Sequence, residues 1–213
     1  MTAFNRRFDP HFAELQARLC AGEIGRVELV CITSRDPAPP PVSYIKRSGG
    51  IFRDMMIHDF DMARFLLGED PVQVFALGSA FDPAIAAAGD FDTAAVTLTT
   101  ASGAICQITN SRRATDGYDQ RVEVHGSTGM LQAGNMRETT VEVANATGFR
   151  TAPTLHFILE RYQAAYTAKV TLFAHCVAAG APMTPGIHDG LCAQILGDAA
   201  AESLATGRPV TIQ

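Results

Sequence analysis

Apolar side chains recur at helical spacing near the start of the chain, at Phe12, Leu15 and Leu19. Asp9 stands directly before a proline, which is typical of a helix N-cap followed by proline in the first turn. Gly22 comes shortly after the last apolar position and favours the end of a helix. The pattern therefore predicts a first helix between Asp9 and Gly22.

The middle of the chain carries short, partly alternating stretches of β-branched, apolar and polar residues, which turn residues separate. Such stretches are typical of strands with one buried face. The segment Thr100-Ala-Ser-Gly103 is typical of a hairpin turn between two of them. We expect strands at residues 26–34, 72–81, 93–100, 104–111, 120–125 and 139–144.

Helical periodicity returns over residues 52–67, 155–178 and 187–205, and Gly207 and Pro209 end the last of these segments. Strands grouped between helices favour an α+β domain, in which helices cover one face of a mostly antiparallel, open sheet. An exposed apolar sheet face is unfavourable for a monomer. We therefore expect the other face to form the interface of a homodimer or homotetramer.

The bulk composition narrows the class of protein. The 213 residues, 47% hydrophobic and 18% charged, fit one domain over residues 1–213. The 17 Lys and Arg against 22 Asp and Glu, without a basic run, give no footprint for nucleic-acid binding. No stretch approaches the roughly 18–20 apolar residues of a membrane span, and the first residues lack signal-peptide features. We expect a soluble, cytoplasmic protein that binds neither nucleic acid nor membrane.

The cysteines give no sign of a disulfide framework or a structural zinc site. They are odd in number and form no C-x-x-C pair, so buried, reduced thiols are expected. They are Cys20, Cys31, Cys106, Cys176 and Cys192.

The sequence lacks several short motifs that are typical of common cofactor-binding or catalytic sites. It contains no G-x-G-x-x-G, no Walker phosphate loop, no G-x-S-x-G and no H-E-x-x-H. We therefore assign no cofactor-binding residue and no metal-binding residue, and expect any catalysis to come from another group of side chains.

The most informative group lies in the expected helix over residues 52–67. Asp54, His58 and Asp61 stand at i, i+4 and i+7, so a continuous helix would present them on one stripe. Burying carboxylates with an imidazole costs several kcal/mol unless they pair with each other or with a ligand. Asp54 could hold the ring of His58, and an imidazole so held is suited to be a general base near neutral pH.

The stripe is also compatible with two roles other than catalysis. An Asp and a His at i and i+4 are often a satisfied hydrogen-bonded pair and nothing more. Two carboxylates and an imidazole could instead form part of a metal site, although a full ligand set from one helical stripe is geometrically awkward. Asn110, Arg112 and Arg113, farther along, fit a solvated strand end better than part of a site.

Three segments together resemble a known family. The first segment is Phe4-Asn-Arg-Arg-Phe-Asp-Pro10, and the second is Gly49-Gly50 with Asp54, His58 and Asp61, spaced as G-G-x-x-x-D-x-x-x-H-x-x-D. The third is the tail, with Thr184, Asp189-Gly-Leu, Ala201-Glu-Ser203 and Gly207-Arg-Pro-Val210. They resemble the C-terminal domain of the glucose-fructose oxidoreductase, inositol dehydrogenase and rhizopine-catabolism (Gfo/Idh/MocA) family. Within it, the turn Gly117-Tyr118-Asp119 resembles that of inositol 2-dehydrogenases.

The resemblance implies roles for particular residues. His58 would take the hydroxyl proton as hydride leaves the substrate for NAD or NADP, and Asp54 would orient His58 and bind substrate. Tyr118 would contact a substrate hydroxyl, with Asp61 and Lys46 as further substrate-binding residues. Residues 1–5 are expected to be the tail of a nucleotide-binding Rossmann domain, which would hold the cofactor and is missing from this sequence.

The function implied by the resemblance is that of a domain within a larger enzyme. We expect the substrate-binding and oligomer-forming domain of an NAD(P)-dependent dehydrogenase that oxidises a CH–OH group of a cyclic polyol or sugar, with myo-inositol as the expected substrate. The fragment alone is expected to be inactive and to bind no cofactor. The alternative is a non-catalytic ligand-binding or oligomerisation module with the same fold.

Overall fold

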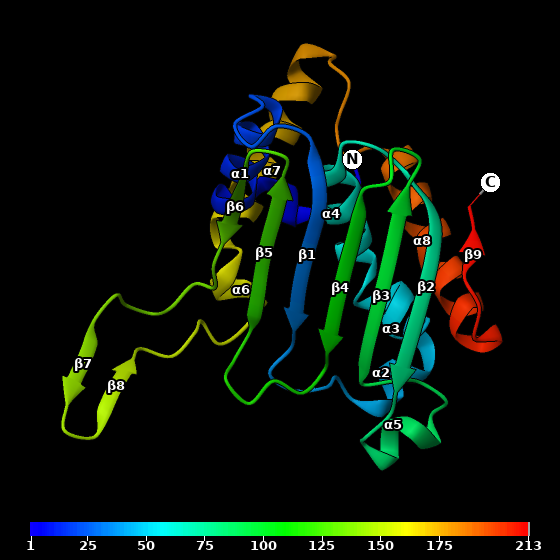
Figure 1. Ribbon diagram of the computed structural model, residues 1–213. Helices are drawn as coiled ribbons and strands as arrows, with labels where there is room; N and C mark the ends of the chain where they lie inside the picture. The colour runs from blue at the N-terminus through cyan, green and yellow to red at the C-terminus, as the bar shows by residue number, and fades with distance from the viewer. Residues whose placement is uncertain (213) are drawn as a thin grey trace.

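A seven-stranded sheet forms the body of the chain, and a separate two-stranded hairpin projects from it (Figure 1). The computed structural model describes residues 1–212. The strands are β1 (Val27–Arg35), β2 (Pro71–Ser79), β3 (Thr93–Thr100), β4 (Ile105–Ser111), β5 (Asp119–Gly126), β6 (Gly129–Ala133), β7 (Glu142–Asn145), β8 (Gly148–Thr151) and β9 (Val210–Thr211). The order in the main sheet is β6-β5-β1-β4-β3-β2-β9, and β7 pairs with β8 in the hairpin.

Most of the helices lie against one face of the main sheet, and the short helix that follows β2 lies beyond the strand ends (Figure 1). The helices are η1 (Asn5–Phe8), α1 (Pro10–Cys20), α2 (Val42–Ser48), α3 (Ile51–Asp54), α4 (Ile57–Leu67), α5 (Pro83–Ala87), α6 (Ile158–Arg161), α7 (Gln163–Ala179) and α8 (Ile187–Thr206). The first α-helix begins as predicted, because the carboxylate of Asp9 accepts hydrogen bonds from the backbone N–H groups of His11 (3.1 Å) and Phe12 (3.2 Å). Across residues 1–212, no helix is long and apolar enough to cross a membrane.

One parallel pair interrupts an otherwise antiparallel sheet. Strands β1 and β4 run parallel, from Leu29 opposite Ile105 to Arg35 opposite Ser111, and the other neighbouring pairs are antiparallel. This topology confirms the predicted α+β class. Because β1 and β4 are parallel, the residues that follow both strands emerge at the same edge of the sheet.

The core lies between the sheet and the helices, and alternate residues of the strands fill it. Val30, Leu98 and Ile108 are fully buried, and they belong to one apolar cluster with Phe60 of α4 and Leu196 of α8. Burying each such side chain contributes about 1.5–3 kcal/mol. The two-residue period predicted from the sequence therefore identifies which strand positions face the helices.

Several elements differ from the sequence prediction. The expected helix over residues 52–67 is broken, because the N–H groups of Met55 and Met56 both donate to the carbonyl of Ile51 (3.1 and 2.9 Å) and a turn separates α3 from α4. The expected helix over residues 155–178 is likewise divided at Tyr162. The pattern also missed α2, the short strands β6, β8 and β9, and the projection of the β7–β8 hairpin away from the body.

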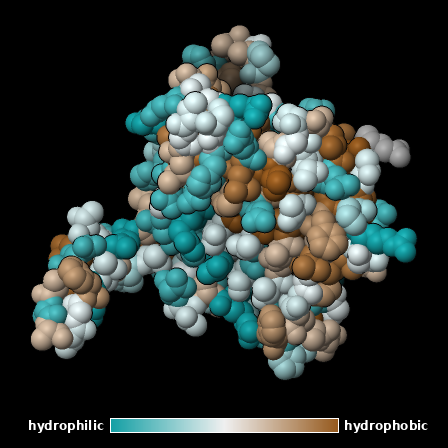
Figure 2. All heavy atoms as spheres, in the orientation of Figure 1, coloured by the Kyte–Doolittle hydropathy of each residue, from teal (hydrophilic) through white to brown (hydrophobic). Residues whose placement is uncertain are grey.

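The face of the sheet opposite the helices is open. Figure 2 shows this face, where apolar colour gathers over β4, β3 and β2 and hydrophilic colour over the β5 side. Exposed apolar side chains on these strands include Leu77 and Ile105, and Met130 extends the set on β6. The open face fits the surface expected for subunit contacts, which remain a prediction.

The N-terminal segment is fixed to the helical layer by ion pairs. Arg6 and Arg7, neighbours in η1, pair with Asp59 and Asp61 on α4. Arg6 and Asp59 are both buried, and the guanidinium of Arg6 also donates to the hydroxyl of Ser34 (3.0 Å). The chain entering the domain is therefore held at a defined position on α4.

We predict that Arg6→Met and Asp59→Asn each lower the free energy of unfolding by about 3–5 kcal/mol, because each leaves the other charge buried without its partner. Urea denaturation measures the change. The double variant should lose less than the sum of the two single variants. Arg18→Met, which breaks an exposed pair with Glu14, is the control and should change stability by less than about 0.5 kcal/mol. Single-variant losses as small as the control's would contradict the assigned role of the buried pair.

Candidate functional site

A cavity of about 570 Å³ opens where the proline-rich segment after β1 meets the start of α4. It combines apolar walls with charged and aromatic side chains, as small-molecule sites do. Its lining residues come from η1, the segment after β1, α2, α3, the turn after α3, α4, the segments after β4 and before β5, and the start of α6. They are Arg6, Asp36, Pro37, Ala38, Pro39, Pro40, Pro41, Tyr44, Asp54, Met55, His58, Arg112, Tyr118, His156, Phe157 and Ile158.

Asp54 ends α3 and faces this cavity. Its carboxylate accepts a hydrogen bond from the hydroxyl of Tyr44 (2.7 Å) and one from Nη2 of Arg112 (3.3 Å). Within residues 1–212, no hydrogen bond joins Asp54 to His58. The expectation that Asp54 holds the imidazole directly is therefore wrong for this conformation, because the turn at Met55 and Met56 separates the two helical segments.

His58 lies in the first turn of α4 and also lines the cavity. Its ring meets the ring of Phe4 edge to face, with centroids 6.0 Å apart, and Nδ1 is buried without a partner among the residues described. Burial, together with the positive charges of Arg6 and Lys169, lowers the pKa of His58 from 6.5 to about 3. The imidazole is therefore neutral at pH 7 and keeps a lone pair that can accept a proton.

Tyr118 reaches the cavity from the loop before β5. Gly117 adopts a φ of +107°, which favours glycine, and this turn directs Tyr118 inward. The Tyr118 ring is buried and packs edge to face against Phe157 (5.7 Å) and Tyr162 (6.0 Å). Burial raises the pKa of the Tyr118 hydroxyl, so it is a neutral hydrogen-bond donor and acceptor. The structure thus brings Asp54, His58 and Tyr118 to one cavity.

The other two predicted substrate-binding residues lie elsewhere. Asp61 does not line the cavity and accepts two hydrogen bonds from Arg7, at 2.9 Å from Nε and 2.6 Å from Nη2. His58 and Asp61 both lie within α4, so the break before α4 displaces Asp54 from the expected stripe, whereas Asp61 is held by its pair with Arg7. Lys46 is exposed in the last turn of α2 and does not line the cavity. Neither residue is brought together with Asp54, His58 and Tyr118 in this cavity, and their assignment as substrate-binding residues stays a prediction.

Sequence reasoning missed three charged residues of the cavity, which are Arg6, Asp36 and Arg112. Asp36 follows β1, and burial raises its pKa to about 6 despite the lowering effect of Arg6 and Arg112. Arg112 follows β4 and is 1% exposed, so it is a buried cation rather than part of a solvated strand end. The missing signal was the parallel pairing of β1 and β4, which brings the ends of these strands together.

A polar layer lies beneath the cavity and connects its charged floor to the sheet. Arg6 pairs directly with Asp59, and the side-chain amide of Asn110 donates a further hydrogen bond to Asp59 (2.9 Å). The hydroxyl of Ser34 contacts both Arg6 (3.0 Å) and the amide of Gln120 (3.1–3.2 Å). Each of these side chains is buried and makes at least one hydrogen bond, although Oδ1 of Asn110 has no partner among the residues described, so the layer supports the side chains above it.

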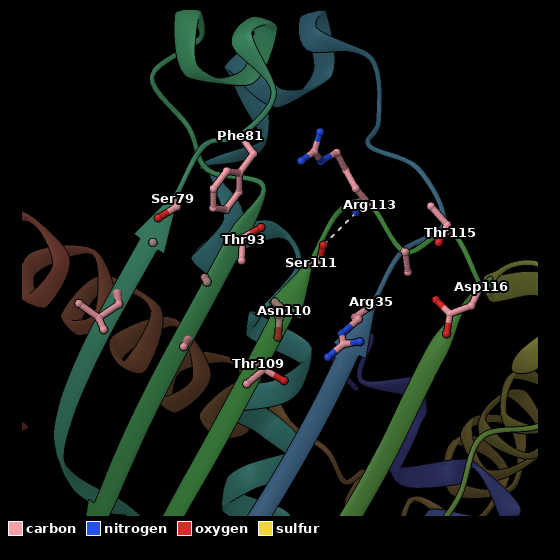
Figure 3. A pocket seen from close by; sticks show the side chains of 15 residues that line it. Arg35, Ser79, Phe81, Thr93, Thr109, Asn110, Ser111, Arg113, Thr115 and Asp116 are labelled. Atoms are coloured by element: carbon pink, nitrogen blue, oxygen red, sulfur yellow. Dashed lines mark hydrogen bonds between the residues drawn. The ribbon is translucent and has the colours of Figure 1, made fainter.

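A second hollow, also of about 570 Å³, lies on the open face near the ends of β1 to β4 (Figure 3). The close-up shows Arg35, Arg113 and Asp116 around a floor of short side chains such as Thr109 and Thr93. The sheet separates this hollow from His58. Its position on the open face associates it with the expected subunit surface rather than with the candidate site.

The fold and the cavity agree with a family comparison. Residues 12–132 match the model of the GFO/IDH/MocA C-terminal domain. The chain therefore belongs to the Gfo/Idh/MocA family, as a C-terminal domain of that type.

Individual relatives narrow the comparison. The chain is 53% identical over its whole length to an inositol 2-dehydrogenase of Rhizobium meliloti and 50% identical to a myo-inositol 2-dehydrogenase of Thermotoga maritima, and it spans 64% of the length of each. A crystal structure described as a putative myo-inositol dehydrogenase from Sinorhizobium meliloti matches the whole chain with a TM-score of 0.98 and 53% identity, and 65% of that chain is covered. A scyllo-inositol dehydrogenase from Lactobacillus casei, solved with NAD(H) and scyllo-inositol, matches 99% of the chain at 28% identity and a TM-score of 0.90, with 64% of that chain covered.

We predict that the imidazole of His58 does not titrate between about pH 5 and 8 in the folded protein, because its pKa is lowered to about 3. NMR of histidine-labelled protein, assigned with a His58→Gln variant, tests this directly. In the unfolded state His58 is protonated below about pH 6.5, whereas in the folded state it stays neutral down to about pH 3. This group therefore makes the free energy of unfolding fall as the pH drops from about 6.5 toward 3. His58→Gln should remove that part of the pH dependence. A midpoint near 6.5 for the folded protein would contradict the assignment.

Proposed function

We propose that this chain is the substrate-binding domain of an NAD-dependent dehydrogenase that oxidises a CH–OH group of a cyclic polyol, with myo-inositol as substrate. The observation that carries the proposal is the cavity, which gathers a neutral imidazole, two carboxyl groups and two arginines from separate elements. The inositol dehydrogenases to which the chain is similar support the substrate class.

The chemistry of the cavity suits a polyhydroxylated ring. Asp36 and Asp54 offer acceptors for substrate hydroxyls, while Arg112 and Tyr118 offer donors. The five residues from Pro37 to Pro41, four of them prolines, form a stiff apolar wall that requires little ordering on binding. A flat ring with hydroxyls around its rim would pair its edge with the polar groups and its faces with the apolar ones.

His58 is the proposed proton acceptor. A base must be unprotonated before it acts, and burial keeps this imidazole neutral at pH 7. A low pKa also makes it a weak base, so the proton moves readily only as the substrate hydroxyl becomes acidic, which happens while hydride leaves the carbinol carbon. Arg6 and Arg112, both lining the cavity, would stabilise negative charge that develops on the substrate oxygen. Asp54 is proposed to bind substrate and to position Arg112.

A nicotinamide supplies the hydride acceptor in such a reaction. The 213 residues contain no G-x-G-x-x-G fingerprint, so we propose that a separate nucleotide-binding domain holds the cofactor against the opening of the cavity. The NAD(H) present in the scyllo-inositol dehydrogenase structure supports NAD rather than NADP. The unpartnered, buried Nδ1 of His58 fits a cavity that is completed by further groups.

The second candidate is a non-catalytic ligand-binding or oligomerisation module. The open sheet face, with Leu77, Ile105 and Met130 exposed, favours subunit contacts whichever function holds. We propose a homodimer or homotetramer through this face.

The decisive experiment joins the chain to the part of the Thermotoga maritima relative that it does not cover. We expect this chimera to reduce NAD with myo-inositol in a panel of polyols, and expect the chain alone to be inactive. In the chimera, His58→Ala should lower turnover by about 10²–10⁴-fold, as loss of a general base does.

His11→Ala is the matched control, because His11 is an exposed histidine on α1 outside the cavity. A chimera that binds NAD but is inert on every polyol would favour the non-catalytic module. Full activity in His58→Ala would show that the proton acceptor has been wrongly assigned.

A further inference from the structure

Three side chains with different donor atoms meet on the surface, outside the candidate site. They are Asp70, directly before β2, and His188 and Cys192, one turn apart in the first turns of α8. One donor atom from each lies within 4.8 Å of the other two. None of the three lines the cavity that contains His58.

We propose that Asp70, His188 and Cys192 form a binding site for a zinc-like divalent transition-metal ion. Imidazole nitrogen, thiolate sulfur and carboxylate oxygen are the three ligand types that Zn²⁺ takes in proteins. The combination disfavours Mg²⁺ and Ca²⁺, which bind through oxygen alone. A water molecule would complete a tetrahedral shell on the exposed side.

The helical pair already has a suitable spacing. Sγ of Cys192 lies 3.6 Å from Nε2 of His188. Bond lengths of about 2.3 Å for Zn–S and 2.0–2.1 Å for Zn–N, at a tetrahedral angle, place the two ligand atoms about 3.6 Å apart. The i, i+4 spacing on α8 therefore presents two ligands at the required separation, and only the carboxylate of Asp70 has to move inward. Because this carboxylate is 60% exposed, it has room to do so.

A neighbouring arginine orients the carboxylate of Asp70, which is the third proposed ligand. Nε of Arg64 donates to Oδ1 of Asp70 at 2.5 Å, and within the described residues Oδ2 has no partner. Such a hydrogen bond to the outer oxygen of a ligating carboxylate is typical of the groups that orient metal ligands. Metal binding would also make Cys192 a thiolate, which is the form of cysteine that ligates zinc.

The site would connect two parts of the fold. Asp70 lies between α4 and β2, whereas His188 and Cys192 lie at the start of α8. A bound ion would fix the beginning of α8 to that connection. The same region holds the pair of Arg7 with Asp189, which joins η1 to α8. The ion would therefore stabilise the folded chain to a degree that rises with its concentration.

Cobalt(II) is the probe, because a thiolate ligand gives it a near-ultraviolet charge-transfer band and tetrahedral geometry gives intense visible bands. Titration of the chain should show both, with one ion bound per chain. Cys192→Ser should abolish the charge-transfer band, and Cys192→Ser, His188→Ala and Asp70→Asn should each weaken binding by about 100-fold or more. Zn²⁺ should displace Co²⁺ and raise the melting temperature of the parent chain but not of Cys192→Ser.

Two variants serve as matched controls. Cys20→Ser removes another exposed thiol, and Asp198→Asn removes another carboxylate of α8. Both should bind cobalt as the parent does. All three ligand residues are at least partly exposed, so their variants should remain folded, which circular dichroism checks. A parent chain without the charge-transfer band at saturating cobalt, or a Cys192→Ser variant of unchanged affinity, would overturn the proposal.

Discussion

The buried pair of Arg6 and Asp59 is the interaction on which the arrangement of the site depends. Taking two charges out of water costs several kcal/mol for each ion, and only close pairing with further hydrogen bonds offsets that cost. Asn110 and Ser34 provide those bonds from β4 and β1. Asp59 is the neighbour of His58 in α4, and Arg6 lines the cavity. One ion pair thus fixes the entry of the chain, the start of α4 and the floor of the cavity.

Much of the fold follows from the pattern of apolar residues, because burial of alternate residues is a local signal. Strand β3 occupies residues 93–100 as predicted, and Asp9 caps α1. The signal fails where local geometry depends on tertiary contacts. Strand β6 is too short to show a period, and the exposed hairpin β7–β8 buries nothing. The breaks at Met55-Met56 and Tyr162 interrupt segments whose composition is helical throughout.

The site residues that lie close together in the sequence could be predicted, whereas those that meet only through the fold could not. Asp54 and His58 lie in one short segment, and the motif identified both. The helical stripe also selected Asp61, which does not line the cavity and instead pairs with Arg7 of η1, a contact that no local spacing encodes. Asp36 and Arg112 are distant in the sequence and meet only because β1 and β4 are parallel neighbours. No spacing within the sequence encodes that adjacency.

One cause explains the opposite pKa shifts of two titratable groups that line the cavity. Removal of water disfavours charge, so it lowers the pKa of His58 to about 3 and raises that of Asp36 to about 6. Arg6 and Arg112 are permanently charged and supply the positive potential that remains. The cavity therefore combines an uncharged base with fixed cations. Such a site favours deprotonation of a substrate hydroxyl, because the arginines stabilise negative charge on the oxygen and the neutral imidazole of His58 can accept the proton.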